Sequence, residues 1–378
     1  MEKYNIASPH FPKDDIDGIL NRFKEILAGD GLLSMGRNVE SFERSFAEYV
    51  GTDYAVSTNS CTSALEIALM AIGITGGDEV IVPAQTFIAT GSSVVLSGAK
   101  AVFCETDDNF LLDFEDMARR ITARTKAVII VHFAGLIHPQ IFEIKKYLKR
   151  RNIYLIEDAA HAHGAKIGQA RAGSIGDIGC FSFYPTKIMT TGEGGMITVN
   201  DGTLHAMCAS LRNRGLDASA GNEIFGHLGS NRRLTEFQAI LGLYQLKRLE
   251  EFVASRNKIA GIYKTLLGDL KKAGCLSFQE YPREIRHSYW RFIVFLRDGG
   301  ISRDRIREHM EKAGIKVDFP YTPLLHLQPV FKNLYGIREG LLPQTEERAK
   351  RHFCLPMHVL ITEKDAHFIG RTLAGFLS

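Results

Sequence analysis

Short apolar runs alternate with amphipathic segments through the first 200 residues of the chain. Apolar runs of about five residues between polar residues or glycines are typical of strands buried on both faces. The segments between them repeat apolar residues at helical spacing. We therefore predict an α/β fold with a mainly parallel sheet covered by helices on both faces. The predicted strands are 54–60, 78–85, 100–107, 126–135, 152–160, 180–185 and 196–199, and the predicted helices are 13–29, 39–51, 62–74, 86–98, 114–122, 142–151 and 203–215.

The pattern changes after this alternation ends. Residues 215–233 are polar and rich in glycine, which predicts an extended loop, and loops of this length usually serve a function or an interface. Residues 234–267 read as one long amphipathic helix that bridges into a second domain. We predict a large cofactor-binding domain over 1–245, whose N-terminal segment can pack on a small C-terminal α+β domain over 246–378. The small domain's clearest features are the strand-like 289–296, the helical 303–314 and the proline-rich 319–329.

Composition narrows the class of protein. The chain has 378 residues, 45% apolar and 24% charged, with a net charge of +3 and both signs interspersed. These values are typical of a globular protein and do not favour nucleic acid or a membrane as the main partner. No apolar run approaches the roughly 20 residues of a membrane span, and the first residues do not resemble a signal peptide. The six scattered cysteines favour reduced thiols, so we predict a cytoplasmic protein.

Hydroxyl side chains gather where the strand over 54–60 gives way to a helix. Ser60, Thr62 and Ser63 lie together at this helix start. Free N–H groups and the helix dipole favour an anion there, and hydroxyls add donors. The alternative is ordinary N-capping, which needs only one of the three. Because capping accounts for only one of the three hydroxyl side chains, the other two favour a phosphate site.

Polar and aromatic residues also follow other strands, at the sheet edge where ligands of parallel sheets bind. Asp158 ends the apolar run IYLIE, so its carboxylate is expected in the cleft, and Phe87 follows an earlier strand. Capping of a helix is the alternative role for Asp158. His161 and His163 could hold a metal, but residues two apart face differently and no third ligand is evident, so no metal is predicted.

Lys187 lies just after the aromatic strand CFSFYP and before the glycine-rich turn TTGEGG. A solvated surface lysine is the simpler interpretation of this stretch. Together with the phosphate site, Phe87 and Asp158, however, Lys187 completes the set that pyridoxal phosphate requires. The lysine forms the Schiff base, the carboxylate keeps the ring nitrogen protonated, a flat side chain covers the ring and a helix N-terminus takes the phosphate.

Several of these motifs also carry a resemblance. The chain contains NSCTSALEIAL, GDEVIVPAQTFIAT, EDAAHAHGA, FSFYPTK with GEGG, GSNRRLTEFQAILGLYQL, and LLHLQPVF with the later CLPMH. Nearly end to end and in the same order, it resembles the DegT/DnrJ-type sugar aminotransferases. The resemblance implies an aspartate-aminotransferase-like fold (fold type I), pyridoxal 5'-phosphate as the cofactor, and a homodimer with shared active sites.

The resemblance also implies roles for individual residues. Lys187 would form the Schiff base and act as general acid and base, and Asp158 would pair with the pyridinium nitrogen. His161 would contact the ring hydroxyl, and Phe87 would lie over the ring. The remaining implied cofactor contacts are the phosphate ligands Ser60, Thr62, Ser63 and Ser182, with Asn231 reaching the phosphate of the other subunit.

The substrate is less constrained. Arg232 stands where the family commonly has an aromatic residue, a departure that concerns the substrate pocket rather than the cofactor chemistry. The candidate substrate ligands are Arg212, Arg214, Arg232, Arg233, Tyr321 and His326. By resemblance the amino donor is L-glutamate and the acceptor a keto sugar, nucleotide-linked, in amino-sugar biosynthesis.

Three alternatives stay open. VHFAGL and TTGEGG are similar to the aminohydroxybenzoate-synthase branch, which performs an aromatising elimination. A cyclic ketone could replace the sugar as acceptor. A non-catalytic regulatory protein that binds the cofactor is the third alternative, against which the intact pair of Lys187 and Asp158 argues. Some relatives carry histidine in place of the lysine and are dehydratases, so Lys187 favours transamination.

Overall fold

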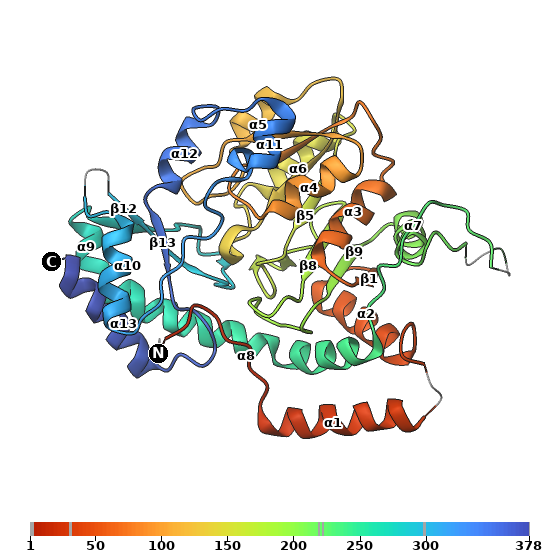
Figure 1. Ribbon diagram of the computed structural model, residues 1–378, viewed down its shortest axis with the longest axis horizontal. Helices are drawn as coiled ribbons and strands as arrows, with labels where there is room; N and C mark the ends of the chain where they lie inside the picture. The colour runs from red at the N-terminus through yellow and green to blue at the C-terminus, as the bar shows by residue number, and fades with distance from the viewer. Residues whose placement is uncertain (1–3, 30–31, 218–219, 221–222, 298–299, 378) are drawn as a thin grey trace.

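A seven-stranded sheet forms the centre of the computed structural model, which describes residues 4–29, 32–217, 220, 223–297 and 300–377 (Figure 1). The order across the sheet is β1-β9-β8-β5-β4-β2-β3. The five strands from β8 to β3 are mutually parallel, and β9 is antiparallel to both of its neighbours. The strands are β1 Tyr54–Thr58, β2 Glu79–Pro83, β3 Lys100–Cys104, β4 Thr125–Val131, β5 Tyr154–Asp158, β8 Ile178–Ser182 and β9 Gly195–Val199.

The strands are apolar throughout because both faces of the sheet are covered. Successive side chains of a strand point to opposite faces. Along β4, Val128 and Ile130 enter one hydrophobic core, whereas Ala127 and Ile129 enter the other. All four side chains are fully buried. The predicted α/β class with a mainly parallel sheet is confirmed.

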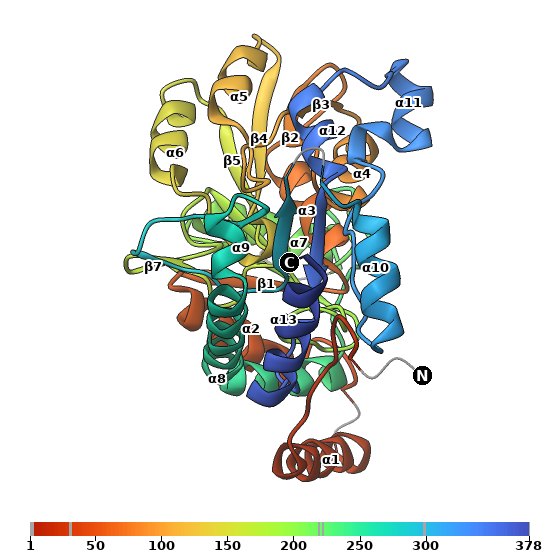
Figure 2. The ribbon, with the colours of Figure 1, turned by 90° about the vertical axis from the view of Figure 1, so that its left-hand side faces the viewer.

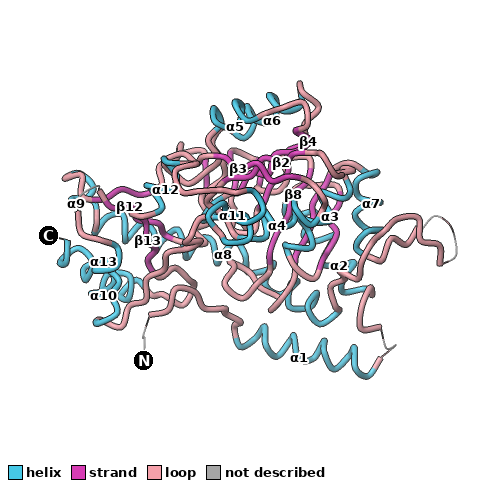
Figure 3. The backbone as a smooth tube through the Cα atoms, turned by 45° about the horizontal axis from the view of Figure 1, so that its top comes forward, coloured by secondary structure: helices cyan, strands magenta, loops and turns pink. Residues whose placement is uncertain are grey.

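Helices cover each face of the sheet. Residues of α3, α4 and α7 share the core that contains Ile129, and residues of α2, α5, α6 and α8 share the other core. Figure 3 shows α5 and α6 on one side of the strands, with α3 and α4 on the other. The helices are α1 Lys13–Ala28, α2 Arg37–Val50, α3 Cys61–Ala71, α4 Ile88–Leu96, α5 Phe114–Arg120, α6 Ile141–Lys149, α7 Gly202–Arg212, α8 Glu236–Leu266, α9 Gly268–Lys272, α10 Arg303–Lys312, α11 Pro329–Tyr335, α12 Pro343–Ala349 and α13 Glu363–Leu377.

The C-terminal third is built around a separate three-stranded antiparallel sheet, in the order β10-β12-β13. Its strands are β10 Leu276–Phe278, β12 Phe292–Leu296 and β13 His352–Leu355. Helices α10 and α13 pack beside this sheet (Figure 2). Helix α8 runs from beneath the large sheet into this C-terminal part (Figure 1). The division into domains 1–245 and 246–378 stays a prediction, and its boundary falls inside α8.

The predicted elements of the first 200 residues all occur, most with ends shifted by one to four residues. The structure adds a small sheet, β11-β6-β7, formed by Ile285–Arg286, Lys166–Ile167 and Ala170–Arg171. Strands of two residues carry no readable periodicity, which is why the sequence did not predict them. Among the described residues, no helix is long and apolar enough to cross a membrane.

The start of α2 depends on a side chain from 200 residues further along the chain. The buried carboxylate of Glu236 accepts hydrogen bonds from the backbone N–H groups of Gly36, Asn38 and Val39 at 2.8, 2.9 and 3.1 Å. A fourth bond of 2.7 Å comes from the Asn38 side chain. These bonds satisfy N–H groups that a helix start leaves free.

Replacing Glu236 with alanine is expected to lower the free energy of unfolding by about 3 kcal/mol, because buried donors would lose their acceptor. Urea denaturation followed by circular dichroism measures this change. Glu251→Ala is the matched control, since Glu251 is exposed on the same helix, and it should change stability by less than about 0.5 kcal/mol. Equal effects of the two substitutions would contradict the capping role.

Candidate active site

One cavity lies at the carboxyl ends of β5 and β8, between the large sheet and the C-terminal part. Its volume is about 600 Å³. This is the edge at which parallel sheets bind ligands. It brings together residues that the sequence separates by as many as 262 positions, from Ser60 to Thr322. The residues predicted from sequence that line it are Ser60, Thr62, Phe87, Asp158, His161, Ser182, Lys187 and Tyr321.

The N-terminus of α3 opens into this cavity. Ser60 is the N-cap residue, and its hydroxyl accepts a hydrogen bond of 3.1 Å from the Ser63 backbone. Ser60 therefore caps the helix, as the alternative interpretation expects, and Thr62 lines the cavity. Strand β9 passes close behind, since a Cβ on Gly195 would lie 2.5 Å from the Ser60 carbonyl. Only glycine permits this approach, which keeps the helix start at the sheet edge.

Asp158 is the last residue of β5, and its carboxylate is almost fully buried. The Thr90 hydroxyl donates to one carboxylate oxygen at 2.9 Å, and the Ala160 backbone N–H donates to the other at 3.2 Å. Thr86 in turn shares a 2.8 Å hydrogen bond with Thr90. Burial raises the pKa of Asp158, and these two donors and the positive charge of Lys187 oppose that rise. Two hydrogen bonds thus fix the Asp158 carboxylate in position, where it interacts with the positive charge of Lys187.

Lys187 ends a tight turn that follows β8, closed by a 2.9 Å hydrogen bond from its backbone N–H to the Tyr184 carbonyl. Its ammonium lies 4.7 Å from the centre of the Trp290 ring. The Trp290 indole N–H donates to the Thr186 carbonyl at 2.8 Å, so the ring is tied to the same turn. Desolvation lowers the pKa of Lys187 to about 8, although electrostatic interactions with Cys61 and Asp158 oppose this change. A neutral amine is therefore accessible near physiological pH.

Aromatic rings form the wall opposite the helix start. The His161 ring stacks on Trp290 at 3.7 Å between centroids, and its Nε2 is 2.8 Å from the Tyr321 hydroxyl. Burial lowers the pKa of His161 well below its usual value, with Lys187 as a further cause. Its Nδ1 is buried without a hydrogen-bond partner. Phe87 is 52% exposed at the cavity mouth, 5.7 Å from the Tyr321 ring.

Five of the six predicted substrate ligands lie outside the lining of this cavity, and two of the five, Arg212 and His326, are buried. Arg212 is buried against Glu43, with further contacts to Ser57, because its helix packs on β1. His326 is buried beside Glu346, with its Nε2 3.0 Å from the carboxylate. Both side chains serve the packing of their own regions instead of facing the cavity.

The other predicted contacts that lie outside this cavity come mostly from the loop after α7. Arg232 pairs with Glu66 at 2.6 Å, and Arg233 donates to Asn213 at 2.7 Å. Arg214 lies over the Phe225 ring, and Asn231 is exposed. Ser63 lies behind Ser60 and is not part of the lining. A contact from Asn231 to the partner subunit's phosphate stays a prediction.

Sequence reasoning missed several residues of the cavity. Thr90 donates to Asp158 from the first turn of α4 and also bonds to Thr86, which lies two residues before the helix. Trp290 and Arg291 come from the segment just before β12. The single tryptophan of the chain, followed by an arginine within the apolar run YWRFIVFL, was the available signal.

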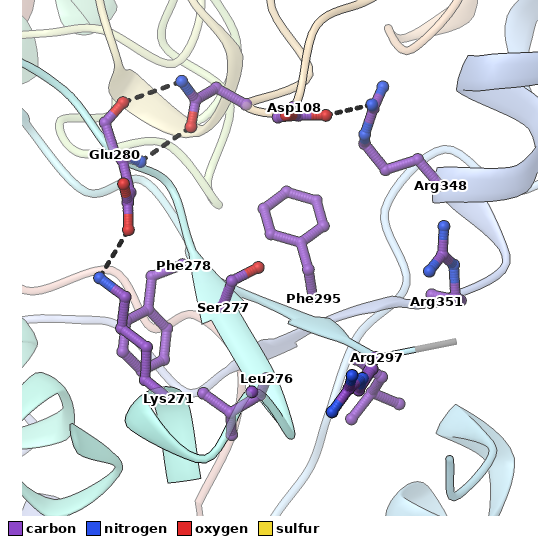
Figure 4. Close-up of a pocket in the computed structure, with 13 residues that line it drawn as sticks. Asp108, Lys271, Leu276, Ser277, Phe278, Glu280, Phe295, Arg297, Arg348 and Arg351 are labelled. Carbon is purple, nitrogen blue, oxygen red and sulfur yellow. Dashed lines mark hydrogen bonds and ion pairs between the residues drawn. The ribbon is translucent and has the colours of Figure 1, made fainter. Parts of the chain in front are cut away.

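A second cavity, of about 740 Å³, lies apart from Lys187 between β10, β12 and the loop at Asp108 (Figure 4). Its acids are engaged by neighbouring bases, Glu280 by Lys271 and Asp108 by Arg348. Its lining shares no residue with the Lys187 cavity. Among the described residues, no group of three or more histidines, cysteines or acids is arranged to hold a metal.

Comparison with known proteins decides the family. Residues 13–374 match the profile of the DegT/DnrJ/EryC1/StrS aminotransferase family. The chain belongs to this family. A GDP-perosamine synthase from Caulobacter vibrioides is 36% identical over 99% of this chain and 98% of its own. A UDP-N-acetyl-3-dehydro-alpha-D-glucosamine 3-aminotransferase from Acidithiobacillus ferrooxidans is 34% identical, covering 95% of each chain. The structure of an aminotransferase from Psychrobacter cryohalolentis superimposes with a TM-score of 0.90 at 31% identity, covering 99% of this chain and 98% of that one.

Membership of the DegT/DnrJ/EryC1/StrS family makes the chain an aminotransferase and confirms the predicted fold type. The predicted cofactor, pyridoxal phosphate, is that of the family. The cavity fits this group on its own features. It offers the N-terminus of α3, a fixed carboxylate, a lysine of lowered pKa and the buried Nδ1 of His161, which has no hydrogen-bond partner among the described residues.

Proposed function

We propose that this aminotransferase moves an amino group from L-glutamate to a nucleotide-linked keto sugar, with pyridoxal phosphate held in the Lys187 cavity. The observation that carries the proposal is the convergence of Lys187 and Asp158 on one cavity beside the N-terminus of α3. The names of the relatives support a sugar acceptor, since they include a GDP-perosamine synthase and a UDP-sugar aminotransferase.

In this assignment the two ends of the cavity hold the two ends of the cofactor. The helix start with Ser60 and Thr62, together with Ser182 at the end of β8, would hold the phosphate. Asp158 would hold a proton on the ring nitrogen, because a buried carboxylate stabilises an adjacent cation. When bound, pyridoxal phosphate supplies an electron-accepting ring that carries the amino group between the two substrates.

Lys187 would hold the cofactor covalently through its amine and, once released from that bond, move protons at the reacting carbon. Its pKa of about 8 suits both tasks, because the neutral amine is the nucleophile and the base. The stacked rings of His161, Trp290 and Tyr321 would exclude water from one side of the site. In a homodimer, Asn231 would add a phosphate contact across the interface.

The experiment that tests the proposal follows the nitrogen atom. Holoenzyme is incubated with nitrogen-15-labelled L-glutamate and a panel of nucleotide-linked keto sugars, free keto sugars and cyclic ketones. Mass spectrometry of the products should find the label in a nucleotide-linked amino sugar, with one 2-oxoglutarate formed for each amine. The amine released by glutamate and the amine gained by the ketone then balance.

Three results would contradict the proposal. Transfer to cyclic ketones alone would exclude the sugar as acceptor. A dehydrated aromatic product would favour the aminohydroxybenzoate-synthase reaction instead. Formation of 2-oxoglutarate with no ketone accepting the label from this panel would leave the donor assignment standing and remove the acceptor class.

A further inference from the structure

Arg291 is a buried cation of the Lys187 cavity that the roles above leave unexplained. It lies just before β12, lines the cavity and is 4% exposed. One Nη donates to the Trp290 carbonyl at 3.2 Å. Its Nε is buried and makes no hydrogen bond to any residue that the structure describes. The nearest acid, Asp318, is 3.5 Å from this Nε, which is longer than a charge-assisted hydrogen bond.

The environment of Arg291 leaves its charge undercompensated. A guanidinium has five N–H donors and stays charged, so burial is costly unless anions or acceptors meet those donors. Asp318 meets this need poorly, because its side chain is 37% exposed and therefore partly solvated. The other charged groups lining the cavity are Lys187, Asp158 and Glu193, and Asp158 is already bound to Thr90 and Ala160. A ligand's anion would complete the site.

The position of Arg291 relative to Lys187 indicates which anion of a ligand Arg291 would bind. The Lys187 ammonium lies 4.7 Å from the centre of the Trp290 ring, and the guanidinium carbon of Arg291 lies 4.1 Å from the same centre. The two cations therefore contact the same ring and lie no more than 8.8 Å apart. In an amino acid, the amine and the α-carboxylate are bonded to the same carbon. A ligand whose amine reacts beside Lys187 brings its α-carboxylate within this short range.

We propose that Arg291 binds the α-carboxylate of the amino donor, so that the donor's amine is directed to the Lys187 side of the cavity. This inference rests on the proposed aminotransferase function and adds the site that selects α-amino acids as donors. The other candidate arginines do not compete for this role within the chain. Arg212 and Arg232 are paired with Glu43 and Glu66 outside the cavity.

The test compares the two half-reactions in the holoenzyme. Arg291→Gln should lower kcat/KM for L-glutamate in the donor half-reaction by about 100-fold, because the buried ion pair between Arg291 and the α-carboxylate would be lost. The acceptor half-reaction, started from the aminated enzyme, should change by less than about threefold. 4-Aminobutyrate, which lacks an α-carboxylate, is the matched donor, and its rate should be nearly the same in both enzymes. Arg283→Gln, an exposed arginine nearby, is the control and should behave as wild type.

A second readout does not depend on turnover. Isothermal calorimetry with 2-oxoglutarate and the unaminated holoenzyme, a pair with no amino group to transfer, should show about 100-fold weaker binding to the Arg291→Gln variant. Arg291→Lys keeps the charge but loses the planar fork, and about 10-fold weaker binding is expected. If Arg291→Gln does not fold, the Arg291→Lys variant, which retains the buried cation, still tests the inference.

Loss in the acceptor half-reaction without loss for glutamate would overturn the inference and assign Arg291 to a phosphate of the sugar nucleotide. Unchanged glutamate kinetics and unchanged 2-oxoglutarate binding in both variants would also overturn it. If wild-type enzyme bound 2-oxoglutarate through Arg291 but transferred no amine to any sugar, the acceptor assignment would fail and the Arg291 site would stand.

Discussion

Replacing Lys187 with alanine is expected to lower the turnover of the holoenzyme by at least about 10³-fold, because one side chain both anchors the cofactor and moves the proton. An ordinary lysine, with a pKa of about 10.4, is protonated and inert at neutral pH. Desolvation in the cavity lowers the pKa of Lys187 to about 8. Raising the pH through 8 therefore increases the fraction of Lys187 that is a neutral amine. Lowering the pH protonates the amine, which then cannot act as a nucleophile. Stopped-flow measurement of the glutamate half-reaction measures the loss.

Two controls separate catalysis from folding. Lys126→Ala removes an exposed lysine at the opposite end of β4 from the cavity and should leave turnover unchanged. Added methylamine should restore part of the activity of Lys187→Ala, since a free amine can replace the missing base. A Lys187→Ala enzyme with more than a tenth of wild-type turnover would refute the assigned role.

Replacing Asp158 with asparagine is expected to lower turnover by about 10²-fold, while the fold stays intact. Asparagine has the same shape but is neutral, and it can accept from the Ala160 N–H through its oxygen and donate to the Thr90 hydroxyl through its NH2 group. Without the negative charge, a proton on the cofactor's ring nitrogen loses its partner, and the ring accepts electrons less readily. Single-turnover kinetics and the absorption spectrum of the bound cofactor both report this change.

Asp113→Asn is the matched control for that substitution. Asp113 caps α5 and is not among the residues that line the cavity, and its carboxylate accepts from the Asp116 backbone N–H at 2.7 Å. We expect a small loss of stability and an unchanged turnover. An Asp158→Asn enzyme with wild-type turnover and spectrum would show that Asp158 only positions the loop after β5.

The sequence predicted the large sheet well because its strands are buried on both faces and stand out as apolar runs. Val128 to Val131 is such a run, and no tertiary detail is needed to recognise it. The small sheet that joins Lys166–Ile167 to Ile285–Arg286 could not be read in this way. Its strands are two residues long, and their pairing depends on how distant segments dock.

The residues of the candidate site also fall into those that local sequence predicts and those that only tertiary packing places. Asp158, Ser182 and the start of α3 follow local rules, since strand ends and helix starts meet at one sheet edge. Trp290 and Arg291 reach the cavity only because the C-terminal part packs against that edge. Arg212 and His326 lie outside the cavity, and a sequence does not show that Glu43 and Glu346 are their partners.

The central claim is that Lys187 is the covalent anchor of the cofactor in an aminotransferase site. Borohydride reduction of the holoenzyme fixes the cofactor to the lysine that holds it, and proteolysis with mass spectrometry then identifies the labelled peptide. We expect a single labelled peptide that contains Lys187, and no label when the enzyme is first converted to its aminated form with glutamate. Label on another lysine, or label unaffected by glutamate, would contradict the assignment.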